Sequence, residues 1–156
     1  MNQNPTKVAV IGVGSLGQHH ARVYAENADA QLVGIVDVDR ARAEEIASKY
    51  QTRACASIDE LDCVDAASVV VPTEQHFSVA SRLLERGVHC LVEKPLTLST
   101  EEGKELCRLA EEKDVVLQVG HIERFNPAVM ALNEVLANPL FIEAHRLGPP
   151  APRVKD

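Results

Sequence analysis

The stretch Lys7-Val-Ala-Val-Ile-Gly-Val-Gly-Ser-Leu-Gly17 decides the fold. Its first five residues form an apolar, β-branched run that predicts a buried strand over 7–11. A helical pattern follows over 14–26, and Gly12, Gly14 and Gly17 between them have the spacing G-x-G-x-x-G. Glycines at this spacing permit a tight turn, the approach of a pyrophosphate to the backbone, and close packing of helix on strand. The stretch therefore predicts a strand–turn–helix unit whose helix N-terminus faces the phosphates of a dinucleotide.

Asp37 supports the same interpretation, because it ends a second predicted strand over 32–36 and stands 20 residues after Gly17. A carboxylate here can accept hydrogen bonds from the hydroxyls of an adenine ribose, but it would repel a 2′-phosphate. NAD is therefore the expected cofactor, and NADP is less favoured. Arg40 leaves two alternatives open: it could soften that repulsion, or it could be a solvated side chain in the first turn of a helix.

The rest of the chain alternates short β-branched runs with helical patterns, which is typical of a parallel sheet with crossover helices. The predicted elements are a helix from the N-cap Asp39 to about 50, a helical turn opened by the capping box Ser57-Ile-Asp-Glu60, a strand over 66–71, a helix over 74–86 closed by Gly87, a strand over 88–92, a helix over 99–113, a strand over 115–119, a helix over 127–137 and a strand over 140–146. This pattern predicts an α/β fold with one Rossmann-type, doubly wound parallel sheet.

Composition and charge exclude several classes of protein. The net charge is −7 and the Lys and Arg residues are scattered, which argues against a nucleic-acid partner. No apolar run approaches the ~20 residues needed to cross a bilayer, and the first residues lack the layout of a secretory signal, so we expect a cytoplasmic protein without membrane contact. Four cysteines match no metal spacing, so reduced thiols and no metal site are expected: Cys55, Cys63, Cys90 and Cys107.

A second candidate site is Glu93-Lys94-Pro95, which follows the predicted strand over 88–92. Ligands of open α/β sheets bind at the carboxyl ends of the strands. A lysine buried at such a place needs a partner or a chemical use, because burial disfavours its charge. Lys94 could therefore serve a reaction, or it could be a surface lysine paired with Glu93. Pro95, at a strand end after a charged residue, is a candidate for a cis peptide bond.

Four motifs in this order resemble one known family. They are G-x-G-x-x-G-x-x-H from Gly12 to His20, Val71-Pro-Thr-Glu-Gln-His76, Glu93-Lys94-Pro95, and Gly120-His-Ile-Glu-Arg-Phe-Asn-Pro127. Together they resemble the glucose–fructose oxidoreductase / inositol dehydrogenase (Gfo/Idh/MocA) family over nearly the whole chain. The resemblance implies a nicotinamide-dependent dehydrogenase of sugars, polyols or related compounds.

The family's site residues carry over to matching positions here. The resemblance implies that Lys94 is catalytic: its ammonium would hydrogen-bond the substrate oxygen while hydride passes to the nicotinamide. Glu93 would lie near the nicotinamide ribose, and His20 is interpreted as a packing residue. Many relatives have Thr-Pro where this chain has Pro72-Thr73. The complete predicted cofactor site is Gly12, Val13, Gly14, Ser15, Leu16, Gly17, Asp37, Val38, Arg40, Val71, Pro72, Thr73, His76, Glu93 and Lys94.

The last motif most resembles a subgroup that acts on nucleotide-activated amino sugars, the UDP-N-acetylglucosamine 3-dehydrogenases. The resemblance implies that His121, Arg124 and Asn126 face the substrate or its diphosphate, with Arg124 making bidentate contacts. The alternative is a tight turn between domains, with Arg124 in a structural ion pair.

Family members have about twice this length and continue into a sheet-rich α+β domain with a D-x-x-x-H segment, most substrate contacts and the oligomer interface. No D-x-x-x-H follows Arg124 here. We therefore expect one Rossmann domain over 1–146, including a linker from about 120, and a tail over 147–156 toward an absent domain. Such a fragment would bind dinucleotide and turn over little, whereas the full-length enzyme would be a homo-oligomer.

Two other functions fit parts of the pattern. A non-catalytic module that senses the NAD/NADH ratio would need the glycine turn but not Lys94. A methyltransferase that uses S-adenosylmethionine would share the turn and the acidic residue but has no use for Glu93-Lys94-Pro95. The position of Lys94 favours the dehydrogenase.

Overall fold

A computed structural model describes residues 4–136, 138–145 and 147. The chain divides into two compact units, over residues 1–121 and 122–156, and each is described by itself. Parts of three predicted segments lie outside the described residues: the end of the helix over 127–137, Arg146 of the last strand, and residues 148–156 of the tail.

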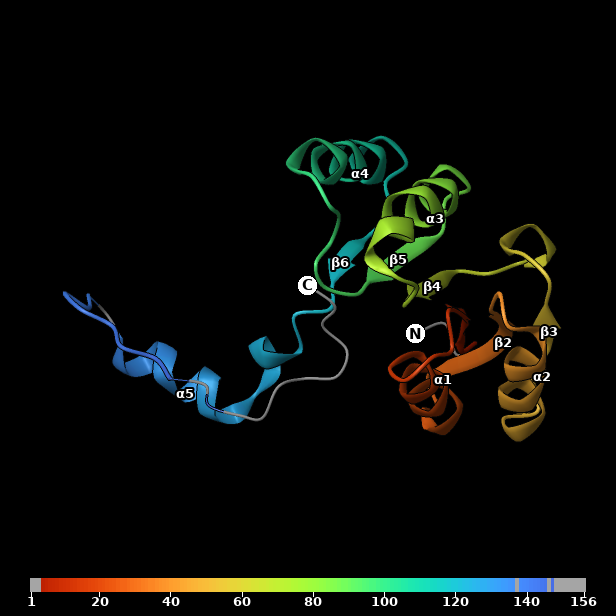
Figure 1. Ribbon diagram of the computed structural model, residues 1–156, viewed down its shortest axis with the longest axis horizontal. Coiled ribbons are helices and arrows are strands. Elements are labelled where there is room, and N and C mark those ends of the chain that lie inside the picture. The colour runs from red at the N-terminus through yellow and green to blue at the C-terminus, as the bar shows by residue number, and fades with distance from the viewer. Residues whose placement is uncertain (1–3, 137, 146, 148–156) are drawn as a thin grey trace. The chain divides into compact units, whose positions relative to one another are not determined.

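The first unit is built on one sheet of six parallel strands in the order β3-β2-β1-β4-β5-β6 (Figure 1). The strands are β1 Thr6–Ile11, β2 Ala30–Val36, β3 Ala54–Cys55, β4 Ala66–Val69, β5 His89–Val92 and β6 Leu117–Val119. This order belongs to doubly wound dinucleotide-binding sheets, and it confirms the predicted fold class. Only the two-residue strand β3 was not predicted.

Four α-helices connect the strands of the first unit: α1 Gly17–Glu26, α2 Arg40–Lys49, α3 Thr73–Glu85 and α4 Thr100–Glu112. A 3-10 turn, Ile58–Glu60, follows β3. The predicted caps of α2 and α4 are confirmed, because Asp39 accepts a hydrogen bond from the N–H of Arg42 and Ser99 accepts one from the N–H of Glu102. Gly87 has a φ of +76°, as the predicted left-handed end of α3 requires.

The helices cover opposite faces of the sheet, with α1 and α2 on one face and α3 and α4 on the other (Figure 1). Side chains of β1 point alternately to the two faces, so Val10 joins the core under α1 and α2, whereas Ala9 and Ile11 join the core under α3 and α4. Leu84 of α3 and Leu106 of α4 are fully buried in the second of these cores. Both faces of the sheet are thus covered, as a parallel sheet requires.

The structure corrects the bounds of two predicted elements and the existence of a third. Helix α1 begins at Gly17 rather than Gly14, because residues 14–16 form the turn itself. Strand β4 ends at Val69 rather than Val71, since its neighbours β1 and β5 also end at the paired residues Ile11 and Val92. Residues 140–145 contain no strand: the six paired strands all lie before residue 120.

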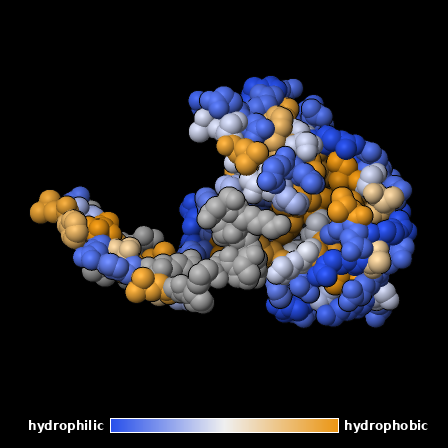
Figure 2. Space-filling model, viewed as in Figure 1, coloured by the Kyte–Doolittle hydropathy of each residue, from blue (hydrophilic) through white to orange (hydrophobic). Residues whose placement is uncertain are grey.

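The second unit contains a 3-10 turn over Ile122–Phe125 and the helix α5 Pro127–Val135, with Pro127 in its first turn as predicted. Several of its large apolar side chains are exposed, among them Phe125 and Met130, and Figure 2 shows apolar residues on the surface of this segment. Across the residues described, no helix is both long and apolar enough to span a membrane.

We predict that Leu84→Ala lowers the free energy of unfolding by about 2–5 kcal/mol, because it leaves a cavity in a core where Leu84 is 0% exposed. Leu98→Ala is the matched control: Leu98 is 66% exposed, so the same change should cost less than about 0.5 kcal/mol. Urea denaturation followed by circular dichroism measures both values. Equal losses in the two variants would contradict the assignment of the core.

Candidate functional site

The candidate site lies at the carboxyl ends of the central strands. Strand order reverses between β1 and β4, and ligands of doubly wound sheets bind in the crevice outside that point. Gly12 directly follows β1, Asp37 follows β2 and Glu93 follows β5. Three of the residues predicted from the sequence therefore share one edge of the sheet.

The three glycines of the first turn have different surroundings. A Cβ on Gly17 would lie 1.8 Å from the carbonyl oxygen of Gly12, and a Cβ on Gly12 would lie 2.6 Å from the carbonyl oxygen of Val70. These two glycines let the turn pack against α1 and the end of β4. Gly14 differs, since a Cβ there would meet nothing within 4 Å. The backbone at Gly14 is thus open to a ligand, as the approach of a pyrophosphate requires.

The N-terminus of α1 can receive an anion. No side chain caps it, and its first turn carries no acidic residue. The first N–H groups of a helix have no partner within the helix, and the helix dipole places partial positive charge there. Among the described residues, the backbone N–H groups of Gly14, Ser15 and Leu16 make no hydrogen bond to another residue. The turn therefore offers donors to a phosphate.

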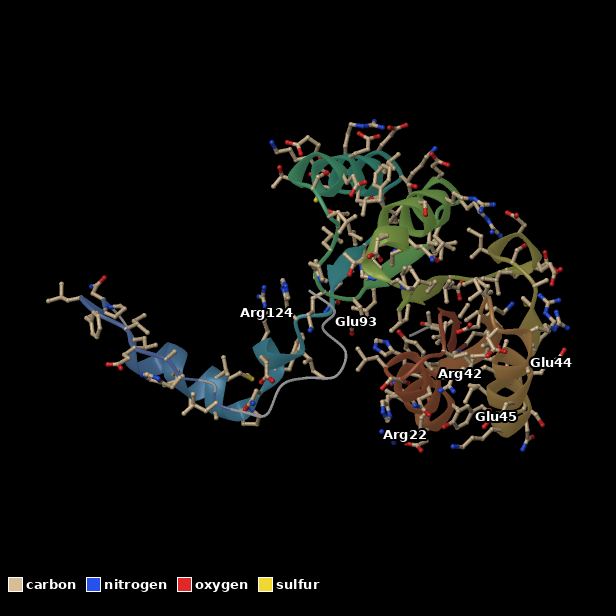
Figure 3. The ribbon with its side chains drawn as sticks, viewed as in Figure 1. Arg22, Arg42, Glu44, Glu45, Glu93 and Arg124 are labelled. Carbon is tan, nitrogen blue, oxygen red and sulfur yellow. The ribbon has the colours of Figure 1, made fainter. Side chains whose placement is uncertain are left out.

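Asp37 lies at the carboxyl end of β2 and is also hydrogen-bonded to the glycine turn. One oxygen of its carboxylate accepts a hydrogen bond from the N–H of Val13 at 2.7 Å, and the other accepts one from the N–H of Asp39 at 2.9 Å. Arg42 of α2 holds the turn from its other side, because its Nε donates to the carbonyl oxygen of Val13 at 2.6 Å (Figure 3). Arg42 was not among the predicted site residues, and no motif in the sequence marks it.

Arg40 is paired with a residue other than Asp37. Nε of Arg40 lies 2.6 Å from a carboxylate oxygen of Glu44, one helical turn later. This hydrogen bond and the nearby negative charge raise the pKa of Arg40 above its usual value. The charge of Arg40 is therefore already paired. Val38 is 97% exposed.

Residues after β4 line the next part of the edge. Val71 and Pro72 form the turn into α3, which begins at Thr73. His76, one turn into that helix, is only 1% exposed. Its two ring nitrogens lie 2.9 Å from the carbonyl oxygen of Val71 and 2.8 Å from that of Pro95. His76 thus links two loops of the site and presents almost no surface of its own, and its contact with a cofactor stays a prediction.

Lys94 is exposed, and within the described chain it forms no ion pair. The alternative of a pair with Glu93 is therefore not observed; only the backbone N–H of Lys94 donates to Glu93, at 3.2 Å. Of the two alternatives, the exposure of Lys94 fits a surface side chain, but one without the pair to Glu93. The Lys94–Pro95 peptide bond is cis, as the sequence suggested.

Glu93 and His20 form a contact that the sequence analysis did not foresee. The Nε2 atom of His20 lies 3.3 Å from Oε1 of Glu93, and both side chains are less than one fifth exposed. The Nδ1 atom of His20 lies 3.1 Å from the hydroxyl of Ser68. The interpretation of His20 as a packing residue was therefore incomplete, because its ring makes polar contacts on both sides.

The predicted substrate residues belong to the end of the first unit and to the second. His121 and Arg124 are exposed, and Arg124 makes no ion pair with any described residue, so the structural pair considered for it is not observed. Asn126 has a local role: its side-chain oxygen accepts from the N–H of Ala128 at the start of α5, and its amide donates to Glu123. This is an N-cap contact.

The cysteines offer no metal site. All four are free thiols, and burial raises the pKa of Cys90 to about 12, which keeps that thiol protonated. In the described part of the chain, no group of three or more His, Cys, Asp or Glu side chains could hold a metal ion.

Comparison with known proteins confirms the predicted family resemblance. The family model for the oxidoreductase family with an NAD-binding Rossmann fold (Gfo/Idh/MocA) matches residues 6–121. UDP-N-acetylglucosamine 3-dehydrogenase from Acidithiobacillus ferrooxidans is 46% identical over 152 residues, which cover 96% of this chain and 48% of that protein. The NAD(+)-dependent scyllo-inositol 2-dehydrogenase from Bacillus subtilis is 34% identical over 131 residues, 81% of this chain and 38% of that protein.

Solved structures show the same relation. A structure of the Acidithiobacillus ferrooxidans enzyme superposes with a TM-score of 0.80 at 46% identity, over 85% of this chain and 44% of that one. The structure of GenD2 from gentamicin A biosynthesis, in complex with NAD, gives a TM-score of 0.83 at 31% identity, over 86% of this chain and 40% of that one. This chain spans less than half the length of the curated relatives it matches.

We predict that Gly17→Ala lowers the free energy of unfolding by about 2 kcal/mol or more, because the added Cβ meets a backbone oxygen at 1.8 Å and the turn must shift. Gly14→Ala is the control within the same turn, where open space should keep the loss below about 1 kcal/mol. Thermal unfolding of the two variants beside the unmodified chain tests this. A Gly17→Ala variant as stable as Gly14→Ala would refute the packing role of Gly17.

Proposed function

We propose that this chain, which belongs to the oxidoreductase family with an NAD-binding Rossmann fold, is the cofactor domain of a nicotinamide-dependent dehydrogenase. In this proposal the dinucleotide lies across the crevice with its pyrophosphate on the glycine turn. The observation that carries the proposal is the open backbone at Gly14 beside the uncapped N-terminus of α1. Free N–H groups at a helix N-terminus are suited to bind the two negative charges of a diphosphate.

The remaining residues of the edge divide between the two ends of the dinucleotide. Asp37, at the end of β2, would accept hydrogen bonds from the adenine ribose with the lone pairs that Val13 and Asp39 leave free. The other end would extend past β1 over the ends of β4 and β5, near Val71 to Thr73 and Glu93.

When bound, the nicotinamide accepts a hydride from a carbinol carbon of the substrate. Lys94, exposed at the end of β5 and free of ion pairs in the described chain, would hold the substrate oxygen by a charge-assisted hydrogen bond and assist the movement of its proton. Nδ1 of His76 lies 2.8 Å from the carbonyl oxygen of Pro95, and this contact supports the backbone next to Lys94.

We further propose that the substrate is a sugar, polyol or nucleotide sugar, and that most of its contacts come from the half that the relatives have beyond this chain. The 46% identity to a UDP-N-acetylglucosamine 3-dehydrogenase supports a nucleotide sugar. His121 and Arg124 are both exposed and would contact such a substrate. Arg124 would bind the diphosphate of the nucleotide sugar. Asn126 would act indirectly by capping α5. A homo-oligomer in the cytoplasm completes the proposal, and four free thiols fit a reducing compartment.

NAD is proposed over NADP because the charge at the adenine end is negative. A 2′-phosphate about 4 Å from the Asp37 carboxylate would meet a repulsion of about 4 kcal/mol at an effective dielectric of about 20. Arg40 would do little to offset this, since its guanidinium is paired with Glu44.

We predict that this chain binds NAD at least about tenfold more tightly than NADP, because only NADP carries the repelled phosphate. Asp37→Asn keeps the size of the side chain and removes its charge, so the difference between the two cofactors should shrink. Calorimetric titration of both proteins with both cofactors measures this. Tighter binding of NADP to the unmodified chain would refute the argument from Asp37.

We also predict that Lys94→Ala, in a protein that contains both halves found in the relatives, lowers turnover about 10²-fold or more while cofactor affinity stays nearly constant. Steady-state kinetics and cofactor titration measure the two quantities separately. A loss of cofactor affinity without a loss of turnover at saturation would make Lys94 a binding residue. A full-length protein that binds NAD but oxidises no sugar would favour the sensor function instead.

A further inference from the structure

A chain of four polar side chains crosses the first unit from α1 to the end of β5. The hydroxyl of Tyr24 lies 2.8 Å from the hydroxyl of Ser68, which lies 3.1 Å from Nδ1 of His20. Nε2 of His20 lies 3.3 Å from Oε1 of Glu93. Tyr24 and His20 stand four residues apart on α1 and so share one face of that helix.

The order of donors and acceptors among these four side chains is consistent with a neutral imidazole of His20. Tyr24 can donate its O–H to Ser68, Ser68 can donate its O–H to Nδ1 of His20, and the N–H at Nε2 can donate to Glu93. In this arrangement every group has a partner and the imidazole is the Nε2–H tautomer. Among these four side chains, this arrangement places a single negative charge, on Glu93.

That charge is held in place. Besides His20, the N–H of Lys94 donates to Oε2 of Glu93, and a Cβ on residue 120 would lie 2.7 Å from Oε1, so only glycine fits there without a shift. The Glu93 side chain is 16% exposed, and Ser68 is fully buried. A carboxylate that is partly withdrawn from water acts more strongly on a neighbouring charge than an exposed one does.

The position of Glu93 relates this charge to the redox state of a ligand. With the adenine ribose at Asp37, the other half of a dinucleotide extends over the ends of β4 and β5, and Glu93 is the first residue after β5. The oxidised nicotinamide ring carries a positive charge, whereas the reduced ring is neutral. A fixed carboxylate at this end attracts only the oxidised ring.

We propose that Glu93, positioned by His20, makes this site prefer the oxidised over the reduced nicotinamide dinucleotide. The proposal rests on the proposed function, since it needs the dinucleotide in the crevice. Glu93 supplies the charge, and His20 is a positioning residue that acts through Glu93. At equal concentrations of the two forms, such a preference fills more of the site with the oxidised dinucleotide than with the reduced one.

The test is the ratio of the dissociation constants of NADH and NAD⁺ for this chain, measured by calorimetry and by NADH fluorescence. Glu93→Gln removes the charge and keeps the shape, so the ratio should fall about tenfold, as for two unit charges roughly 12 Å apart at an effective dielectric of about 20. Damage to the fold weakens both ligands alike and leaves the ratio unchanged. Glu112→Gln is the control that removes the same charge elsewhere. Glu112 is the last residue of α4, whereas the loop that follows β5 leads into the first residue of that helix.

His20 is tested by a pair of variants. His20→Leu leaves Glu93 without its side-chain donor and should lower the ratio about threefold, whereas His20→Gln can still donate an N–H to Glu93 and should restore most of it. An unchanged ratio in Glu93→Gln would overturn the proposal while NAD binding stands. A ratio that moves with Glu93→Gln but not with His20→Leu would overturn the role of His20. If the unmodified chain binds neither form, the proposed function fails, and this inference fails with it.

Discussion

The contact between Gly17 and the carbonyl oxygen of Gly12 is the constraint on which the rest of the site depends. Without a side chain at residue 17, the start of α1 lies directly against the end of β1. Because the two elements lie so close, the first N–H groups of α1 are at the carboxyl edge of the sheet, where the strand order reverses. Asp37 and Arg42 then hold the turn from two sides through the N–H and the carbonyl oxygen of Val13. The turn is therefore supported by the fold before any ligand arrives.

Most of the fold could be predicted from the sequence because its signals are local. The apolar runs of five strands, the caps Asp39 and Ser99, and the left-handed Gly87 each act within a few residues of the element they define. What could not be predicted depends on pairing at a distance. Strand β3 has only two residues and shows no periodicity, yet it pairs with the end of β2. Residues 140–145 have a strand-like sequence, but no partner strand pairs with them among the described residues.

The candidate site divides in the same way. The residues that follow strands, such as Gly12, Asp37 and Lys94, could be found from position alone, and the family resemblance added the catalytic role of Lys94. Their supporting partners could not. His20 and Ser68 are 48 residues apart in sequence, and Arg42 is 29 residues from Val13. The burial of His76 and the exposure of Lys94 likewise depend on how the loops pack. A motif names the residue at the edge of a sheet, but tertiary structure decides what that side chain touches.

The position of the His76 ring between two loops has a consequence for ligand recognition. Because one buried imidazole ring lies 2.9 Å from the carbonyl oxygen of Val71 and 2.8 Å from that of Pro95, it ties the loops after β4 and β5 to each other. A small molecule that settles on either loop meets a preorganised wall and does not have to order it. The loss of conformational entropy that usually accompanies association is then smaller, and more of each new contact is retained as affinity.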